Sequence, residues 1–249
     1  MNRLTGAASS VVSLVPSISE TLMSWGVRPA AVTRFCEVPG LPTVGGTKNP
    51  DVPAIVAMAP ELVLMDEEEN RLEDAESLRR AGIRVHATHV RSVADVRPTL
   101  EQLWNVLGRP APCPGAFVDV EGGDGPQGIG AGEGRVESTV WVPIWRRPWM
   151  SIGEDTYASS LLSVSGLRNV HAASVVRYPT TTIEEAAAFH PDFVLAPSEP
   201  YRFSERHRLE LETVAPVVFV DGQDLFWWGV RTPAALGRML KLAATLVPR

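Results

Sequence analysis

A phrase that occurs twice in this chain constrains its fold more than any other feature. Residues 55–65 read IVAMAPELVLM, and residues 185–196 read EAAAFHPDFVLA. In each copy a short helix-like run stops at a proline, an acidic residue follows, and a buried-strand pattern begins. The two prolines, Pro60 and Pro191, are 191 − 60 = 131 residues apart. This offset is too long for a solenoid or propeller repeat and indicates a duplicated α/β domain.

Strand patterns alternate with helix patterns in the sequence around both copies of the repeated phrase. Ser17 with Glu20 is predicted to cap the first helix, and Thr232 with Pro233 to begin the last one. Because such alternation is typical of βαβ units, we predict a mostly parallel sheet in the first lobe. The predicted strands are 11–15, 30–33, 62–65, 83–87, 138–142, 193–195 and 217–220, and the predicted helices are 17–26, 51–59, 71–81, 92–107, 157–165 and 233–246.

The segment 109–137 has a different composition from the rest of the chain. It is proline-rich at first and then glycine-rich, with the run EGGDGPQGIGAGEG at 121–134. A segment of this composition cannot bury enough apolar surface to compensate for the conformational entropy that it would lose on ordering. We therefore expect an N-terminal α/β lobe at 1–108, a Pro/Gly-rich linker at 109–137 and a C-terminal α/β lobe at 138–249. The literal GxGxxG at 123–128 opens no helix, so it predicts no dinucleotide site.

Composition excludes several classes of protein. The 249 residues are 45% hydrophobic, enough for one large core or two smaller ones. A net charge of −6 and a pI near 5.4 argue against nucleic-acid binding. No run of about 18 apolar residues predicts a membrane span. Residues 1–10 lack the apolar core of a secretory signal, so we expect a cytoplasmic monomer, or a periplasmic or cell-surface one if a leader was removed.

Aromatic and arginine side chains follow two strands of the second half. Ligands of open α/β sheets bind beyond the carboxyl ends of the strands, so these segments are candidate ligand contacts. Pro143 and Pro148 exclude a helix between them, which predicts tryptophans in a loop. Such loops favour a large, flat, partly polar ligand, and packing between lobes is the alternative. The second-lobe candidates are Trp145, Arg146, Trp149, Ser198, Asp224, Phe226, Trp227, Trp228 and Arg231.

The corresponding positions of the first half give weaker signals. The acidic run 66–69 is most simply a solvated face, although it also suits docking onto a basic partner. His86 and His89 would face opposite sides of an extended strand, which does not favour a shared metal. No catalytic set is recognisable, so we predict neither enzymatic activity nor an intrinsic metal or cofactor. The first-lobe candidates are Ser17, Arg34, Phe35, Lys48, Asp66 and Glu67.

A series of phrases, in a fixed order, extends over nearly the whole chain outside the linker. They include VVSLVPSISETL at 11–22, VGG at 44–46, LRRAGIRV at 78–85, SIG at 151–153 and APVV at 215–218, together with the two copies of the repeated phrase. With them the chain resembles the class III substrate-binding proteins of ABC importers, the helical-backbone family that binds cobalamin and iron siderophores. Its nearest resemblance is to the cobalamin-binding branch.

This resemblance implies two Rossmann-like α/β lobes with a central ligand cleft and a corrinoid or other metal chelate as the ligand. Trp149 stands where that branch offers an aromatic side chain to the ligand, and Asp224, Phe226 and Arg231 match its Asp-aromatic…Arg stretch. Three positions depart from the family. Asp66 replaces a tryptophan, Leu72 replaces the first-lobe docking glutamate, and the Gly/Pro-rich linker shortens or replaces the interlobe helix. Docking to an ABC permease would then use acidic residues near Glu73 and Glu205.

The expected function is therefore non-catalytic binding of a corrinoid or another metal chelate. A ferric-siderophore or haem binder is one alternative. Another is a chelatase-like or tetrapyrrole-modifying enzyme on the same fold, with His86, His89, Glu67 or Asp224 as metal or acid/base groups. A third is a partner-binding module in which the tryptophans form a protein interface.

Overall fold

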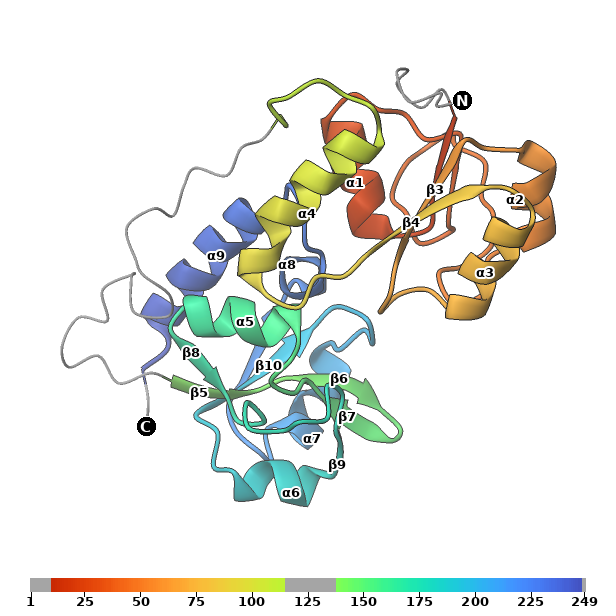
Figure 1. The fold of residues 1–249 in the computed structure, drawn as a ribbon. Coiled ribbons are helices and arrows are strands. Elements are labelled where there is room, and N and C mark those ends of the chain that lie inside the picture. The colour runs from red at the N-terminus through yellow and green to blue at the C-terminus, as the bar shows by residue number, and fades with distance from the viewer. Residues whose placement is uncertain (1–9, 115–137, 248–249) are drawn as a thin grey trace. The chain divides into compact units, whose positions relative to one another are not determined.

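The computed structural model describes residues 10–114 and 138–247. These residues belong to two compact units (Figure 1). Unit 1 holds the described residues up to His89 and from Asp95 to 114, and unit 2 holds Val90–Ala94 and the described residues from 138 onward. Most of the predicted linker lies outside the described residues, and the predicted lobe boundaries stay a prediction.

Unit 1 is built on a four-stranded parallel sheet in the order β2-β1-β3-β4, counted over the described residues. The strands are β1 (Val11–Ser13), β2 (Ala31–Val32), β3 (Leu62–Asp66) and β4 (Arg84–Thr88). The helices are α1 (Pro16–Ser24), α2 (Val52–Met58), α3 (Leu72–Arg80) and α4 (Val93–Val106), of which the part from Asp95 onward belongs to unit 1. The prediction of a parallel sheet is confirmed.

Helices cover both faces of this sheet, which is why its central strand is apolar at nearly every position. Figure 1 shows α2 and α3 on one side of the sheet, and α1 and α4 on the other. On the first side Val63 and Met65 pack with Ile55 of α2 and Leu78 of α3. All five residues of β3 are buried, Asp66 at its end included. A parallel sheet buried on both faces requires such a continuous run rather than an alternating one.

Unit 2 repeats this plan with the strand order β11-β10-β5-β8. The strands are β5 (Ser138–Trp141), β8 (Leu167–Asn169), β10 (Phe193–Pro197) and β11 (Val217–Val220). The helices are α5 (Tyr157–Val164), α6 (Ile183–Ala188), the 3₁₀ helix η2 (Glu205–His207), α7 (Arg208–Leu211), α8 (Gly222–Phe226) and α9 (Thr232–Thr245). Figure 1 shows α5 and α9 on one side of the sheet, with α6 and α7 on the other.

The two sheets have the same topology, as the repeated phrase predicts. In each unit the first strand lies between the second and the third, and the fourth lies beyond the third. The repeated phrase supplies the third strand, β3 or β10, in both. The acidic residue of the phrase directly precedes each strand and makes the equivalent backbone hydrogen bond in both units. Glu61 N–H donates to Ser10 O, and Asp192 N–H donates to Thr139 O. The prediction of two α/β lobes is thereby confirmed.

Three local predictions were wrong. The segment from Trp145 to Trp149 is not a loop but a hairpin, in which β6 (Pro143–Arg146) pairs antiparallel with β7 (Trp149–Ser151), and β7 pairs with β9 (Thr180–Thr181). Ser17 does not cap α1, because the N-cap is Val15 and no side chain caps that end. Thr232 lies inside α9, whose N-cap is Arg231, one residue earlier than predicted.

None of the helices within residues 10–114 and 138–247 is long and apolar enough to cross a membrane.

Candidate functional site

The carboxyl edge of the unit 2 sheet gathers most of the predicted ligand contacts. Ser198 follows β10, and its N–H donates to Val220 O of β11 at 3.0 Å. Its hydroxyl oxygen accepts from Gly222 N–H, the first residue of α8, at 2.9 Å. Gly222 lies so close to Glu199 that a Cβ built on it would be 2.5 Å from Glu199 N. The segments that follow β10 and β11 are therefore in direct backbone contact.

An aromatic cluster stands on the hairpin and on the segment after β10. Trp145 meets Tyr201 edge-on with their ring centroids 5.6 Å apart. Trp149 stacks on Phe203 with centroids 6.0 Å apart and an interplanar angle of 7°, and it also contacts Trp141. Trp141 is fully buried and Phe203 is buried, whereas Trp145 is 44% exposed and Trp149 is half-buried. The cluster thus has a buried base and an exposed aromatic surface.

Arg146 is held in place on this hairpin. Its Nε donates to Glu210 Oε2 at 2.9 Å, and its Nη2 lies 2.9 Å from the same oxygen. The hydrogen bond to Glu210 raises the pKa of Arg146, so the side chain stays cationic. These two contacts with Glu210 fix the orientation of the Arg146 guanidinium on the hairpin that carries part of the aromatic cluster.

Asp224 binds arginines of its own unit. Its Oδ2 accepts from Arg238 Nε at 2.5 Å, and its Oδ1 accepts from Arg238 Nη2 at 2.6 Å and from Arg231 Nη1 at 3.3 Å. The carboxylate side chain is only 3% exposed. Asp224 therefore positions two arginines and does not itself face solvent.

Trp227 and Arg231 form the exposed part of this region. The Arg231 guanidinium carbon lies 5.3 Å from the centre of the Trp227 ring, a cation–π arrangement. Both residues are partly exposed, as is Phe226. Trp228, at 5% exposed, packs in the interior instead. Of the predicted contacts in α8 and after it, Phe226, Trp227 and Arg231 are thus accessible.

At the carboxyl edge of the unit 1 sheet the predicted residues are mostly acidic. Asp66 is buried, and its carboxylate accepts from the Thr88 hydroxyl at 2.7 Å and from Glu68 N–H at 2.9 Å. Burial raises the pKa of Asp66, against the opposing effect of the Thr88 hydrogen bond. Glu67 is exposed and lies 2.7 Å from His89 Nδ1. Asp66 is therefore internal, and the Glu67–His89 pair is at the surface.

Three of the remaining unit 1 candidates, Arg34, Phe35 and Lys48, lie between β2 and α2. The Arg34 guanidinium carbon lies 4.9 Å from the centre of the Phe35 ring, and Phe35 is 51% exposed. A Cβ built on Gly46 would be 3.3 Å from Arg34 Nη2, so this guanidinium lies over the loop backbone. Lys48 Nζ donates to Glu68 O. Ser17, in the first turn of α1, is buried.

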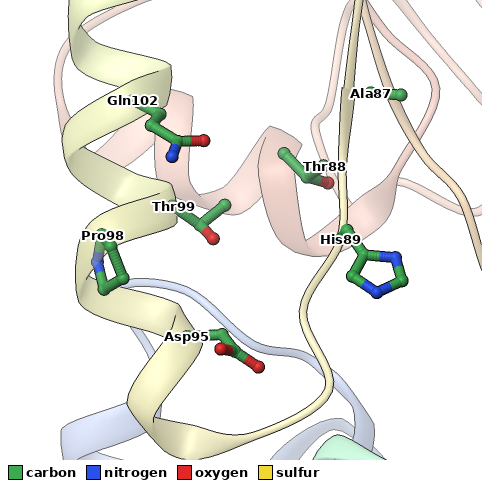
Figure 2. A pocket seen from close by; sticks show the side chains of 7 residues that line it. All are labelled: Ala87, Thr88, His89, Asp95, Pro98, Thr99 and Gln102. Carbon is green, nitrogen blue, oxygen red and sulfur yellow. The ribbon is translucent and has the colours of Figure 1, made fainter.

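A pocket of about 310 Å³ lies in unit 1 between the end of β4 and α4 (Figure 2). Thr88 and His89 line it from the strand side, and Asp95, Thr99 and Gln102 line it from the helix side, with Ala87 and Pro98 completing the wall. The sequence patterns did not indicate Thr99 or Gln102. Their signal is the helical spacing of 95, 99 and 102, which places three polar side chains on one face of α4.

Other contributors were also missed from the sequence. Tyr201 and Phe203 could have been found, because they follow the repeated strand directly. Arg238 carries no signal in the sequence, since it lies inside α9, fourteen residues from the carboxylate that it binds.

The residues of the enzyme alternative do not gather into a metal centre. No group of three or more His, Cys, Asp or Glu side chains within residues 10–114 and 138–247 could hold a metal ion. His86 lies in β4, where burial lowers its pKa, and the nearby Arg84 lowers it further. His89 pairs with Glu67, and Asp224 binds arginines.

The chain is similar in sequence to known proteins. No family model matches the chain. The vitamin B12-binding protein of Salmonella choleraesuis (strain SC-B67) is 24% identical over 193 residues, which cover 76% of this chain and 72% of that protein. That of Pectobacterium carotovorum subsp. carotovorum (strain PC1) is 22% identical over 223 residues, covering 87% and 81%.

Solved structures match over nearly the full length. The periplasmic vitamin B12-binding protein BtuF of Vibrio cholerae has a TM-score of 0.73 at 16% identity, covering 96% of this chain and 99% of that chain. A periplasmic heme-binding protein from Pseudomonas aeruginosa has a TM-score of 0.77 at 19% identity, covering 97% and 95%.

The chain thus has the two-lobed α/β fold of these periplasmic vitamin B12-binding and heme-binding proteins, as the resemblance seen in its sequence predicts. Its sequence is similar to those of the two vitamin B12-binding proteins named above.

Proposed function

We propose that this chain is a non-catalytic binding protein whose ligand is a corrinoid or a closely related metal chelate. The observation that carries the proposal is the accessible tryptophans in the segments beyond the carboxyl edge of the unit 2 sheet: Trp145 is exposed, and Trp149 and Trp227 are partly exposed. The vitamin B12-binding relatives support the choice of ligand class.

The physical argument rests on how these rings are held. A ligand pocket for a large organic molecule needs apolar and aromatic walls with a few polar groups that fix orientation. Trp149 is stacked on Phe203 and Trp145 rests against Tyr201, so neither ring loses much freedom when a ligand covers it. Arg146 and Arg231 stand beside these rings as fixed cations. A flat macrocycle with polar substituents suits such a surface.

A role in import follows as part of the same proposal. The matched solved proteins are described as periplasmic, so we propose that this chain delivers its ligand to an ABC permease outside the cytoplasm. Glu73, in the first turn of α3, is exposed and available for docking. Glu205 is held by Arg208 through hydrogen bonds of 2.6 and 2.8 Å. We therefore propose that Glu73 in unit 1 contacts the permease, and that Glu205, which is paired with Arg208, does not.

Haem is the second candidate ligand. Structural neighbours include the heme-binding protein BhuT in complex with two hemes, with a TM-score of 0.72 at 20% identity over 96% of this chain and 99% of that chain. The same aromatic surface would accept a porphyrin, since both rings are flat and largely apolar.

Direct binding measurements test the proposal. Purified protein is titrated with cyanocobalamin, haemin and a ferric siderophore, followed by absorbance and by the melting temperature. A corrinoid is expected to bind and to raise the melting temperature as its concentration grows. Recovery of unaltered ligand after binding separates a receptor from a tetrapyrrole-modifying enzyme. Haemin binding without corrinoid binding would select the second candidate, and no binding by any of the three would refute the proposal.

A matched pair of variants locates the site. Trp145→Ala removes an exposed ring near Tyr201, beyond the carboxyl end of β10, and is expected to weaken binding about tenfold or more. Phe189→Ala removes an exposed ring that meets His171 edge-on, before the amino end of β10. It should leave affinity unchanged. Equal effects of the two variants would place the ligand elsewhere.

A further inference from the structure

We infer that His207 is a positioning residue for the aromatic cluster of unit 2 and that it fills this role only as a neutral ring. The inference rests on the proposed function and deepens it, because it makes ligand affinity depend on the protonation state of one buried side chain. All of the residues involved lie within unit 2.

His207 is the shared contact of two aromatic pairs in that cluster. Its side chain is buried, at 3% exposed. The centre of its ring lies 5.6 Å from that of Tyr201 and 5.5 Å from that of Phe203, with interplanar angles of 61° and 74°. Tyr201 in turn contacts Trp145, and Phe203 stacks on Trp149. One imidazole therefore supports both tryptophans of the hairpin, each through a single intervening ring.

His207 also fixes the backbone of the segment that carries Tyr201 and Phe203. Ser204 is the N-cap of η2, and its N–H donates to His207 Nδ1 at 3.1 Å. The N–H of His207 donates back to Ser204 O at 2.8 Å. In the usual capping box, the third helical residue is a glutamate or glutamine whose side chain accepts the bond from the N-cap N–H. Here the imidazole is that acceptor.

Both ring nitrogens of His207 face hydrogen-bond donors. Ser204 N–H donates at Nδ1, Arg206 Nε donates at Nε2 over 3.1 Å, and the Tyr201 hydroxyl oxygen lies 3.4 Å from Nε2. A neutral imidazole can accept at one nitrogen, and an imidazolium can accept at neither. Protonation would therefore set an N–H against Ser204 N–H and break the capping bond. Because this bond is made only to the neutral ring, it disfavours the imidazolium.

The charges around the ring favour the neutral form as well. Burial lowers the pKa of His207, and the cations Arg206 and Arg146 lower it further, while Glu210 has the opposite effect. These charged groups face the ring from η2, β6 and α7, and the Tyr201 phenol faces it from the segment after β10. Ligand affinity should therefore be complete above the pKa of His207 and decrease as pH falls through it.

The pH profile of ligand affinity is the main test. NMR of the ring signals first gives the pKa of His207 in the ligand-free protein, which we expect below the ordinary value of about 6.5. Cyanocobalamin is then titrated into wild-type protein from about pH 7.5 down to about one pH unit below that pKa. Affinity should be about fivefold to tenfold weaker at the lower end, because most rings are then protonated.

Two substitutions at His207 separate its position from its protonation. His207→Gln gives the usual capping box with a side chain that takes up no proton, so it should bind within about threefold of wild type at pH 7.5 and lose no affinity in acid. His207→Ala removes the capping acceptor and the ring, so it should bind about fivefold or more weakly at pH 7.5.

His190→Gln is the matched control, at an exposed histidine of the same unit. It should keep the wild-type pH profile, which excludes an effect of losing any histidine. Melting curves at each pH establish that every variant is folded.

The outcomes separate this inference from the proposed function. If cyanocobalamin binds but His207→Gln loses affinity in acid as wild type does, the inference is refuted and the binding function stands. The same holds if His207→Ala binds like wild type, or if the ring stays neutral until the protein unfolds. If cyanocobalamin does not bind the wild-type protein at any pH, the inference and the corrinoid assignment are both refuted.

Discussion

Ala59 and His190 adopt the same left-handed backbone conformation, with φ of 46° and 49°, one residue before the prolines of the repeated phrase. Each N–H donates to a carbonyl three residues earlier, Ala59 to Val56 O at 3.0 Å and His190 to Ala187 O at 2.9 Å. The proline that follows cannot continue a helix. The duplication therefore preserves a specific helix end that leads the chain into the third strand of each sheet.

The first prediction concerns this helix end. A residue other than glycine in the left-handed region costs about 1–2 kcal/mol of stability. Glycine avoids that cost, but its greater freedom in the unfolded chain offsets part of the gain. Ala59→Gly should therefore be neutral or up to about 1 kcal/mol stabilising in urea unfolding, and His190→Gly should change stability in the same direction. Ala57→Gly, two residues earlier inside α2, should lose about 1 kcal/mol. An equal loss in both alanine variants would contradict the observed backbone.

Much of this fold could be predicted from the sequence, for a physical reason. A parallel strand buried on both faces must be apolar without interruption, so LVLM at 62–65 and FVL at 193–195 stand out as strands. The left-handed residues could not be predicted, because alanine and histidine give no hint of positive φ. The hairpin after β5 was missed because Pro143 and Pro148 suggested a loop, although its pairing is local and places Arg146 opposite Trp149.

A second prediction concerns the pH dependence of stability. Burial holds the pKa of Asp66 above its ordinary value in the folded protein. An acid with a raised folded pKa contributes most to stability below its unfolded pKa, and that contribution decreases as pH rises toward the folded pKa. Asp66→Asn keeps a neutral group there, so its stability relative to wild type should increase as pH rises above about 4 and level off only above the folded-state pKa.

Asp51→Asn is the matched control for that measurement. Asp51 caps α2 by accepting from Ala54 N–H at 3.0 Å, and it is exposed. Asparagine caps a helix about as well as aspartate, so the difference from wild type should be small at every pH. Urea unfolding at several pH values measures both variants. A constant offset for Asp66→Asn across this range would show that burial does not perturb the carboxyl.

The third prediction concerns the arginines that Asp224 positions. Arg238→Ala leaves the Asp224 carboxylate with its ion pair to Arg231, at 3.3 Å. Loss of one partner of a buried pair costs about 3–5 kcal/mol, and the half-exposed position of Arg238 reduces the expected loss to about 1–3 kcal/mol. Lys241→Ala, at an exposed position of the same helix, should stay within about 0.5 kcal/mol of wild type. Similar losses in the two variants would assign Arg238 no special role.

The role of Asp224 shows where prediction from the sequence stops. Its position in an Asp-aromatic…Arg stretch indicated a ligand contact, and Arg231 and Trp227 do face each other as that stretch suggests. The structure adds Arg238, from the middle of α9, which turns the carboxylate inward. Tertiary packing between α8 and α9 brings these residues together, and neither local pattern nor spacing encodes it.

The last prediction tests the contact between the segments that follow β10 and β11. Gly222→Ala would place a Cβ 2.5 Å from Glu199 N and 2.6 Å from Glu199 O, so the two backbones must separate. We expect a loss of about 1–3 kcal/mol, with weaker ligand binding because Tyr201 moves with its segment. Gly237→Ala makes the same chemical change inside α9, where no atom lies within 4 Å of the new Cβ. It should stabilise the protein by about 0.5–1 kcal/mol without changing affinity. Urea unfolding and ligand titration of both variants decide the matter: a harmless Gly222→Ala would mean that the close approach of Glu199 does not hold this edge of the sheet together.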